Sequence, residues 1–304
     1  MLSSGEAPVS YQREHMDRAS ELAIVRRAYA KHIMAAAGIA DRRVEAAFAA
    51  VPREDYLGPG PWPILRWGRG YVLTPSPDPV YLYDDVLVGI IPERDLNNGQ
   101  PSFLAGLIAG GAPRAGDHAV HIGAGIGYYT AILAHLVGRR GRVTAIEFDV
   151  GLAARLAANF AGQRAVRVVP GDGARVAFDP ADVILVNAGA TRPADPWLDG
   201  LAEGGRLILP LTTDKGFLGM EAGPIERRGA VFRIERRSGE FLARWISPVA
   251  IFPCEGARDP GSERALDGAF TKGGWDKVTR LYRRRDLPDE RCWLKAADWC
   301  LAYE

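Results

Sequence analysis

A glycine-rich loop constrains this chain more than any other feature of its sequence. The loop begins at the end of a predicted apolar strand, His118–Ile122, and opens a predicted helix, Tyr128–Val137. Glycines at such a turn let the backbone approach a ligand closely and direct amide groups at it from the helix N-terminus. A tight structural turn needs glycines as well, so the strand-loop-helix context is what favours a bound nucleotide or nucleoside. The candidate ligand-binding residues of this loop are His121, Ile122, Gly123, Ala124, Gly125, Gly127 and Tyr128.

Predicted strands and helices alternate on both sides of this loop. Besides Tyr128–Val137, predicted helices cover Ser102–Gly110 and Val150–Phe160. Besides His118–Ile122, predicted strands cover Arg142–Glu147, Val166–Val169, Asp182–Asn187 and Gly205–Pro210. This alternation predicts an α/β, Rossmann-like fold with a mostly parallel sheet. Two further runs, Val231–Arg236 and Phe241–Ile251, flank Ser238-Gly239 and predict an antiparallel hairpin at the edge of the sheet.

The segments on either side of this core have other patterns. Arg18–Ala50 predicts two helices, interrupted at Gly38 and resumed after Asp41 as N-cap. The stretch from 51 to 98 is rich in proline and predicts an irregular segment that covers a site. The tail from 264 to 304 predicts helices. We therefore expect three parts: N-terminal helices with a substrate-covering segment in 1–100, a Rossmann-like core in 101–254, and a helical extension in 255–304.

Polar residues follow the other predicted strands at the edge where open α/β sheets bind ligands. Glu147, followed by Phe148, ends the strand after the glycine loop and can accept hydrogen bonds from both ribose hydroxyls of an adenosine. Asp172, between Gly171 and Gly173, follows the next strand; an acid there fits an adenine amino group, and an Asp-Gly pair equally fits a turn. Asn187 ends the fourth strand.

The spacing of the glycines separates two cofactor classes. Gly123, Gly125 and Gly127 form Gly-x-Gly-x-Gly rather than the Gly-x-Gly-x-x-Gly typical of dinucleotide sites, and no second nucleotide-binding half follows. The sequence therefore favours S-adenosyl-L-methionine over a dinucleotide. The enzyme predicted from these residues is a methyltransferase.

Charge and cysteine content exclude other classes. The 38 basic and 37 acidic side chains nearly cancel, so we expect neither nucleic acid nor a membrane surface as partner. Cys254, Cys292 and Cys300 show no CxxC pairing, so we expect no metal site and no disulfide framework. Met1–Ser20 is polar and lacks the apolar core of a signal peptide, and these features together predict a cytoplasmic protein.

Several segments resemble the protein-L-isoaspartate O-methyltransferase family between about Ile39 and Cys254. They are Asp41-Arg-Arg-Val44, Val51-Pro-Arg-Glu-Asp-Tyr56, His121-Ile-Gly-Ala-Gly-Ile-Gly-Tyr128, Gly171-Asp-Gly173 and Gly204-Gly-Arg-Leu-Ile-Leu-Pro210. The resemblance implies a Rossmann-like methyltransferase that binds S-adenosyl-L-methionine and methylates a carboxylate oxygen. Its ribose-binding acid matches Glu147, and its adenine-side acid matches Asp172.

One segment departs from the family pattern. Family members carry Thr-Ile-Ser-x-Pro before the first sheet strand, with the serine close to the methyl group, whereas this chain has Leu96-Asn-Asn-Gly-Gln-Pro101. Gly99 thus replaces the serine. The amides of Asn97, Asn98 and Gln100 can supply donors to a bound carboxylate or bond the segment's own backbone. Tyr83 and Asp84 fall near the family's Tyr-x-Asp position, so the candidate catalytic residues are Asn98, Gln100, Tyr83 and Asp84.

A carboxylate is already nucleophilic, so methyl transfer to it requires alignment and exclusion of water rather than a base. We therefore expect O-methylation of a carboxylate in a peptide, protein or small molecule. The sequence leaves two alternatives open: a different acceptor, such as the hydroxyl or amine of a natural product, and a catalytically inactive cofactor-binding interaction protein.

Overall fold

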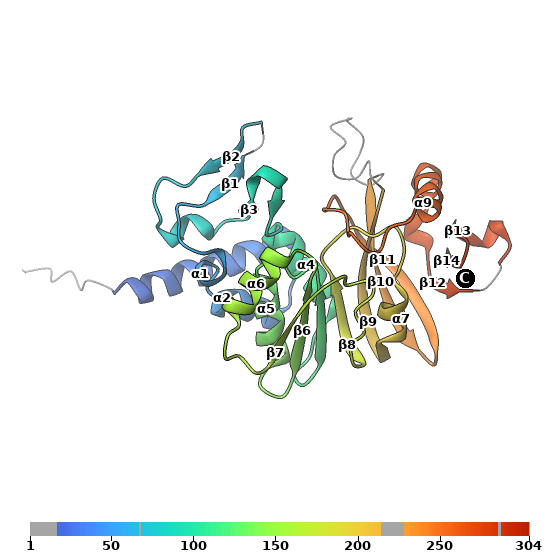
Figure 1. The fold of residues 1–304 in the computed structure, drawn as a ribbon, viewed down its shortest axis with the longest axis horizontal. Helices are drawn as coiled ribbons and strands as arrows, with labels where there is room; N and C mark the ends of the chain where they lie inside the picture. The colour runs from blue at the N-terminus through green and yellow to red at the C-terminus, as the bar shows by residue number, and fades with distance from the viewer. Residues whose placement is uncertain (1–16, 67, 214–227, 285–286, 304) are drawn as a thin grey trace, which may run out of the picture.

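Ten strands form one mixed sheet in the order β13-β14-β12-β11-β10-β9-β8-β5-β6-β7 (Figure 1). The computed structural model describes residues 17–66, 68–213, 228–284 and 287–303. Five neighbouring strands of the sheet are parallel: β5 (His118–Ile122), β6 (Arg142–Glu147), β7 (Val166–Pro170), β8 (Ala181–Val186) and β9 (Leu201–Thr212). This parallel part confirms the predicted Rossmann-like α/β fold.

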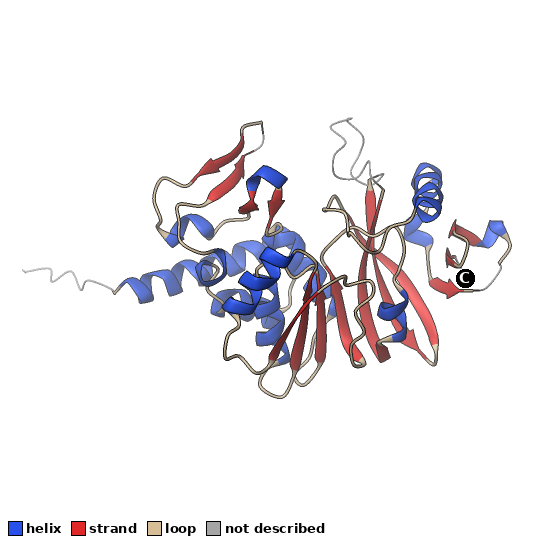
Figure 2. Ribbon diagram, in the orientation of Figure 1, coloured by secondary structure: helices blue, strands red, loops and turns tan. Residues whose placement is uncertain are grey.

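Helices lie beside this sheet (Figure 2). Helices of the predicted core include α4 (Pro101–Gly111), α5 (Tyr128–Val137) and α6 (Val150–Asn159). The ranges predicted for β5, β6 and α5 agree with the structure, because each has an apolar run ended by glycine or a charged residue. Every residue of β5 is buried, as expected for a central parallel strand.

Two N-terminal helices share a hydrophobic core with the sheet. They are α1 (Arg18–Ala37) and α2 (Arg42–Ala50), which confirms the predicted break at Gly38. The Asp41 carboxylate caps α2 and accepts a hydrogen bond from the Arg43 amide at 2.8 Å. Ile33 and Phe48 pack in the same buried cluster as residues of α4, α5 and the sheet. Most of the polar segment predicted to lack a signal peptide, residues 1–16, lies outside the described residues.

The proline-rich segment forms short elements around a small core of its own. They are α3 (Glu54–Leu57), β1 (Pro63–Arg66), β2 (Gly70–Leu73), η1 (Pro79–Leu82), β3 (Gly89–Ile91), η2 (Pro92–Arg94) and β4 (Leu96–Asn97). Strands β1 and β2 pair, as do β3 and β4. Trp62 and Val88 pack in one buried cluster with Ile126 of the glycine loop and Leu152 of α6. The segment therefore covers the carboxyl edge of the parallel strands.

The C-terminal part corrects two predictions. The hairpin of β10 (Gly229–Arg237) and β11 (Glu240–Pro248) does not end the sheet, because β12 continues it beyond β11. The predicted helical tail contains one α-helix, α9 (Pro260–Lys272), the short helices η4 (Trp275–Lys277) and η5 (Asp289–Arg291), and three strands. Those strands are β12 (Arg280–Arg283), β13 (Cys292–Lys295) and β14 (Trp299–Ala302).

Short apolar runs explain the wrong helical prediction. Cys292, Trp293 and Leu294 are consecutive and buried, as are all four residues of β14. Periodicity cannot separate strand from helix in runs this short, so tertiary pairing decides. The extension packs on the sheet, because the Trp293 ring lies 5.3 Å from that of Phe232 in β10 and 5.5 Å from that of Phe270 in α9, centroid to centroid.

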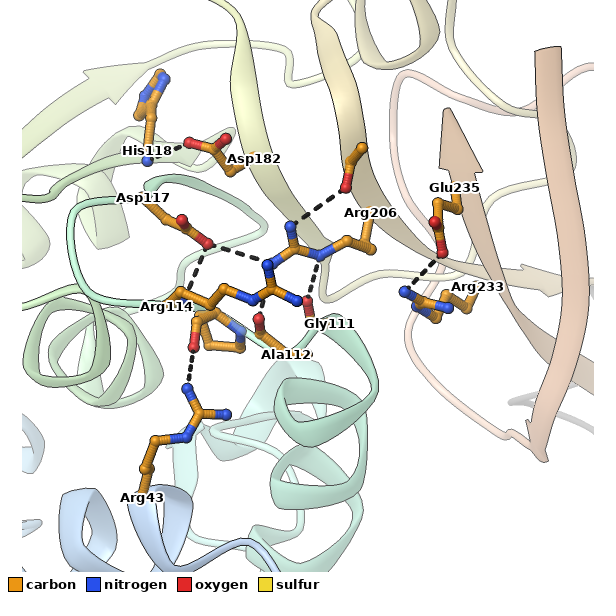
Figure 3. A network of polar contacts seen from close by, with 12 residues as sticks. Arg43, Gly111, Ala112, Arg114, Asp117, His118, Asp182, Arg206, Arg233 and Glu235 are labelled. Atoms are coloured by element: carbon orange, nitrogen blue, oxygen red, sulfur yellow. Dashed lines mark hydrogen bonds and ion pairs between the residues drawn. The ribbon is translucent and has the colours of Figure 1, made fainter. Parts of the chain in front are cut away.

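A buried arginine joins helix α4 to the early part of β9. Arg206 donates from Nε to the Gly111 carbonyl at 3.0 Å and from Nη2 to the Ala112 carbonyl at 2.7 Å (Figure 3). Its Nη2 also lies 3.2 Å from the Asp117 carboxylate. These bonds satisfy carbonyls at the end of α4 that have no partner within the helix. The short helix α7 (Asp195–Asp199), which the sequence analysis missed, precedes β9. No helix among the described residues combines the length and apolarity that crossing a bilayer requires.

Candidate active site

A cavity of about 500 Å³ opens at the carboxyl ends of the parallel strands, against the covering segment. This volume lies in the range of sites for drug-sized ligands. The residues that line it are Ile90, Arg94, Leu96–Asn98, Ile122–Tyr129, Ile146–Leu152, Asp172, Gly173, Asn187, Ala188 and Phe252–Gly256. We call this cavity the crevice. It therefore brings together the glycine loop, the ends of four strands and two segments distant in sequence.

The glycine loop forms the floor of the crevice in a conformation that side chains disfavour. Gly123, Gly125 and Gly127 have φ angles of 71°, 57° and 105°. A Cβ atom on Gly123 would lie 3.1 Å from the Asn187 carbonyl oxygen, and one on Gly127 would lie 2.5 Å from the Phe160 ring. The glycines are thus required both by the turn and by close packing, and they leave backbone at the ligand surface.

Glu147 lies at the end of β6 beside this loop and is buried. Its carboxylate accepts hydrogen bonds from the Gly125 amide at 2.7 Å and from the Asp149 amide at 3.0 Å. Burial raises the pKa of Glu147 above its ordinary value, and the two amide hydrogen bonds oppose that shift. The adjacent Phe148 also lines the crevice and leaves about half of its surface exposed. A desolvated carboxylate held in this way is suited to hydroxyl donors.

Asp172 and Gly173 follow the neighbouring strand β7 and also line the crevice. The Asp172 carboxylate accepts a hydrogen bond from the Ala174 amide at 2.9 Å, so the Asp-Gly turn and a ligand-facing position coexist here. Buried Trp197 donates from its indole nitrogen to the Gly173 carbonyl at 2.7 Å. Gly256 packs so closely that a Cβ atom there would overlap the Asp172 carboxylate. The turn is therefore held on both sides.

Three other predicted cofactor residues have their contacts inside the protein. Asn187 lines the crevice, and its Nδ2 donates to the Gly123 carbonyl at 3.4 Å. Gly171 lies outside the crevice lining and donates its amide to the Glu147 carbonyl at 2.9 Å. His121 is fully buried, and its Nδ1 lies 2.9 Å from Thr130 Oγ1 of α5. Burial lowers the pKa of His121 to about 3, so the imidazole is neutral. Its contact with Thr130 joins β5 to α5.

The amides of the segment that replaces Thr-Ile-Ser-x-Pro have distinct partners. Asn97 accepts a hydrogen bond from the Gly99 amide at 2.9 Å, and Gln100 donates to Asp85 at 2.8 Å. Asn98 is buried, and its Oδ1 accepts from Arg53 Nη2 at 3.1 Å and lies 3.4 Å from the Val88 amide. Its Nδ2 has no hydrogen-bond partner, although Asn98 lines the crevice. Of the three, Asn98 is the one whose side-chain nitrogen is buried without a hydrogen-bond partner.

The predicted catalytic residues Tyr83 and Asp84, like Gln100, lie outside the crevice lining. Tyr83 is buried, donates to the Glu54 carboxylate and lies edge-on to Tyr29. Asp84 is exposed, and its carboxylate bonds the following amide at 2.8 Å. The neighbouring Asp85 accepts from the amide and hydroxyl of Ser102 at 2.8 and 2.6 Å and so caps α4.

Sequence reasoning missed two walls of the crevice. Arg94 and Asp149 form an ion pair at 2.6 Å across the lining, and Asp149 also caps α6 through the Gly151 amide at 2.9 Å. The N-cap signal before Val150 was present in the sequence. The segment Phe252–Gly256 carries no motif, and it reaches the crevice because its backbone bonds Gly189 on both sides, at 2.6 and 2.8 Å.

The crevice fits S-adenosyl-L-methionine in the features that the described residues display. The glycine loop presents backbone where a Cβ atom would collide, Glu147 presents a desolvated carboxylate suited to ribose hydroxyls, and Asp172 presents an acceptor in the lining after β7. Among the described residues, no group of three or more histidine, cysteine or acidic side chains is arranged to hold a metal ion.

Comparisons with known proteins agree with this geometry. Residues 99–222 match the family model described as Protein-L-isoaspartate(D-aspartate) O-methyltransferase (PCMT). The chain is similar to a protein-L-isoaspartate O-methyltransferase of Methanoregula boonei, with 34% identity over 210 residues that cover 68% of this chain and 85% of that protein. A Rhodopseudomonas palustris enzyme of the same name is 33% identical over 60% of this chain and 75% of its own length. For the Thermotoga maritima enzyme, at 28% identity, the match covers 57% of this chain and about half, 51%, of that protein.

Solved structures share the fold. One protein-L-isoaspartate O-methyltransferase structure aligns with a TM-score of 0.61 at 23% identity, covering 84% of this chain and 73% of that one. A putative Plasmodium falciparum enzyme, solved in complex with S-adenosyl-L-homocysteine, aligns with a TM-score of 0.58 at 17% identity over 76% of this chain and 98% of that one. The chain thus belongs to the protein-L-isoaspartate O-methyltransferase family of S-adenosylmethionine-dependent methyltransferases.

Proposed function

We propose that this methyltransferase esterifies a free carboxylate on a peptide or protein, with an isoaspartyl side chain as the first acceptor to test. The names of the relatives supply the acceptor class. The three free, buried cysteines fit action in a reducing cytoplasm. The proposal concerns the methyl acceptor; the cofactor class follows from membership of the family.

One contact carries the proposal. The Tyr129 hydroxyl, on the first turn of α5 after the glycine loop, donates to the Gly99 carbonyl at 3.0 Å. Gly99 occupies the family's serine position, so this bond joins the cofactor loop to the segment that faces the methyl group in the family. Asn97 and Asn98 line the same crevice as Gly123 and Gly125. The acceptor segment and the cofactor segment thus share one cavity.

The chemistry asks little of side chains. A carboxylate oxygen attacks the methyl carbon, the carbon–sulfur bond breaks with its electron pair moving to sulfur, and the products are a methyl ester and S-adenosyl-L-homocysteine. No proton is transferred, so a general base is unnecessary. What the chain must supply is alignment and exclusion of water, and the covering segment with the Phe252–Gly256 wall supports both.

Although Gly99 stands where the family has a serine, the neighbouring residues can still donate hydrogen bonds to a carboxylate. Asn98 lines the crevice next to Gly99, and its buried Nδ2 has no hydrogen-bond partner. A buried donor without a partner gains a full hydrogen bond when a carboxylate arrives. This arrangement favours a carboxylate acceptor over an amine, which would bring a donor to a donor.

The test is transfer of a radiolabelled methyl group from S-adenosyl-L-methionine to a hexapeptide that contains isoaspartate. The matched control is the same peptide with ordinary aspartate. We expect label on the isoaspartyl peptide alone, released as methanol by mild base because the product is an ester. Base-stable label, or no transfer to either peptide while S-adenosyl-L-homocysteine still binds by calorimetry, would refute the proposed acceptor.

A further inference from the structure

A fully buried arginine lies behind the crevice wall without a carboxylate partner. Arg53 takes part in no ion pair found among the described residues, and its exposed fraction is 0%. Its Nη1 donates to the carbonyls of Leu82 at 2.7 Å and Asp84 at 3.3 Å, and its Nη2 donates to the Val86 carbonyl at 2.8 Å. These acceptors are neutral, so no carboxylate bonds the guanidinium directly.

Burying such a charge is costly, and packing alone does not require it. Removing an arginine-sized ion from water costs several kcal/mol unless an opposite charge compensates it, and apolar residues of similar volume usually pack as well. The guanidinium therefore leaves a positive potential in its surroundings. In a medium of low dielectric constant, that potential favours a negative group nearby.

The crevice is the nearest place where such a group can bind. The Arg53 guanidinium carbon lies 5.8 Å from the centroid of the Tyr128 ring, and its Nη2 bonds Asn98 Oδ1 at 3.1 Å. Tyr128 and Asn98 both line the crevice. One layer of side chains thus separates the charge from the ligand.

The same arginine also fixes the orientation of the Asn98 amide. A guanidinium only donates hydrogen bonds, so the amide atom that faces it must be the oxygen. The backbone N–H of Val88 approaches the same side-chain oxygen at 3.4 Å, and the backbone N–H of Asn98 donates to the Val88 carbonyl at 3.0 Å. The rotated amide, with Nδ2 toward two donors, is excluded. Nδ2 is left as the unpaired donor.

We propose that Arg53 is a positioning residue for carboxylate recognition: it orients the Asn98 side chain so that the unpartnered Nδ2 is the donor offered to a ligand carboxylate, and it adds a positive charge that no carboxylate bonds directly. The inference rests on the proposed function for the identity of the acceptor. Two sources can supply the carboxylate, namely the methyl acceptor and the methionine moiety of the cofactor.

The most direct variant is Asn98→Asp. The new carboxylate still accepts from Arg53 and Val88, so the local fold is retained, while it removes the Nδ2 donor and cancels the charge of Arg53. Gln163→Glu, an exposed position outside the crevice lining, introduces the same charge change and serves as the control. Arg53→Met removes both the bond that orients Asn98 and the positive charge. Its control is Arg206→Met. Arg206 is also a buried arginine bonded to carbonyls, and it lies outside the crevice lining.

Three quantities are measured for each variant: KM for the isoaspartyl peptide, Kd for S-adenosyl-L-homocysteine, and Kd for 5′-methylthioadenosine, which lacks the amino-acid carboxylate. If the acceptor supplies the carboxylate, Asn98→Asp raises the peptide KM at least 10-fold while the ratio of the two Kd values stays constant. If the cofactor supplies it, the Kd for S-adenosyl-L-homocysteine rises at least 10-fold and that for 5′-methylthioadenosine does not. Both outcomes support the inference.

The inference is overturned if Asn98→Asp changes neither the KM nor the Kd ratio by more than the Gln163→Glu control. Arg53→Met is expected to repeat the Asn98→Asp pattern, and the double variant is expected to add little to either. Should the wild-type enzyme methylate no isoaspartyl peptide, the proposed function fails on its own, and the Kd ratio alone then decides the inference. Because Asn98→Asp keeps the bond to Arg53, misfolding of Arg53→Met would not prevent the decision.

Discussion

The backbone amide of Gly125 donates a hydrogen bond of 2.7 Å to the carboxylate of Glu147, so the glycine loop and the end of β6 are fixed to each other. A second amide, that of Asp149, holds the other carboxylate oxygen at 3.0 Å. These bonds orient the carboxylate before any ligand binds. Because Glu147 is also desolvated, as the raised pKa reflects, we predict that it is a preorganised acceptor for the hydroxyl donors of a ribose.

We expect Glu147→Ala to weaken binding of S-adenosyl-L-homocysteine by about 1–3 kcal/mol, because it leaves buried donors of the protein and of the ribose without an acceptor. Isothermal titration calorimetry measures this difference directly. Glu240→Ala is the control, since exposed Glu240 at the start of β11 pairs with Arg280 of β12, outside the crevice lining. Equal affinity of the Glu147→Ala and Glu240→Ala proteins would refute the ribose assignment.

Stability at acidic pH should depend on His121. Its pKa is about 3 in the folded protein against an ordinary value of 6.5, so between these values the unfolded chain binds a proton that the folded chain does not. The free energy of unfolding therefore falls as the pH drops below 6.5, by up to about 1.4 kcal/mol per pH unit from this one group. His121→Gln has no titrating ring and should lose this part of the slope.

Urea titrations at several pH values between 4 and 7.5 give the slope for each protein. The control is His135→Gln, which changes an exposed histidine on the same helix that supplies Thr130. We expect His135→Gln to follow the wild-type curve. Parallel curves for wild type and His121→Gln would show that burial of the imidazole does not govern the acid response.

Two glycines at the ends of α5 should differ in their tolerance of alanine. Gly127 has a φ of 105°, and a Cβ atom there would lie 2.5 Å from Phe160 and 2.8 Å from Leu156. Gly138 has a φ of 65° and no atom within 4 Å of such a Cβ. Because its ψ of −172° also lies outside the left-handed helical region, Gly138→Ala should cost about 1–3 kcal/mol of unfolding free energy from backbone strain alone.

Gly127→Ala should cost a further 1–3 kcal/mol or so, because overpacking adds to strain. Chemical denaturation of both variants measures the difference. Gly127→Ala should in addition weaken cofactor binding, since the loop must shift to relieve the contact with Phe160. Equal stability of the two variants would mean that the N-terminal end of α5 shifts to accommodate the added methyl group with little loss of unfolding free energy.

The parallel core was predictable from sequence because local pattern and tertiary environment agree there. β5 is a run of buried residues ended by Gly123, and α5 starts at Tyr128 and ends at Gly138. The C-terminal extension was not, because Trp293 and Trp299 are equally compatible with a helix face and with paired strands. Their state depends on β12, which is set against β11 by contacts far away in sequence.

The candidate site shows the same division. Glu147 and Asp172 were predictable because each follows a strand whose carboxyl end faces the crevice. The partners of Asn97, Asn98 and Gln100 were not, because three neighbouring amides look alike in sequence, and only Arg53 and Asp85, distant in the chain, distinguish them. Long-range hydrogen bonding therefore decides which donor stays free.

Restoring the family's serine should not restore family-like activity. Gly99 has a φ of 78°, and a Cβ atom there would lie 2.8 Å from Leu104, which is 1% exposed. We expect Gly99→Ser to lower the unfolding free energy by about 1–3 kcal/mol through strain and overpacking, with kcat/KM for the isoaspartyl peptide no higher than that of the wild type. Adding Leu104→Ala should relieve the contact, so the two changes should couple favourably in a double-mutant cycle measured by urea denaturation. A Gly99→Ser protein with wild-type stability and raised kcat/KM would instead show that the segment adapts, and that the missing serine limits the present enzyme.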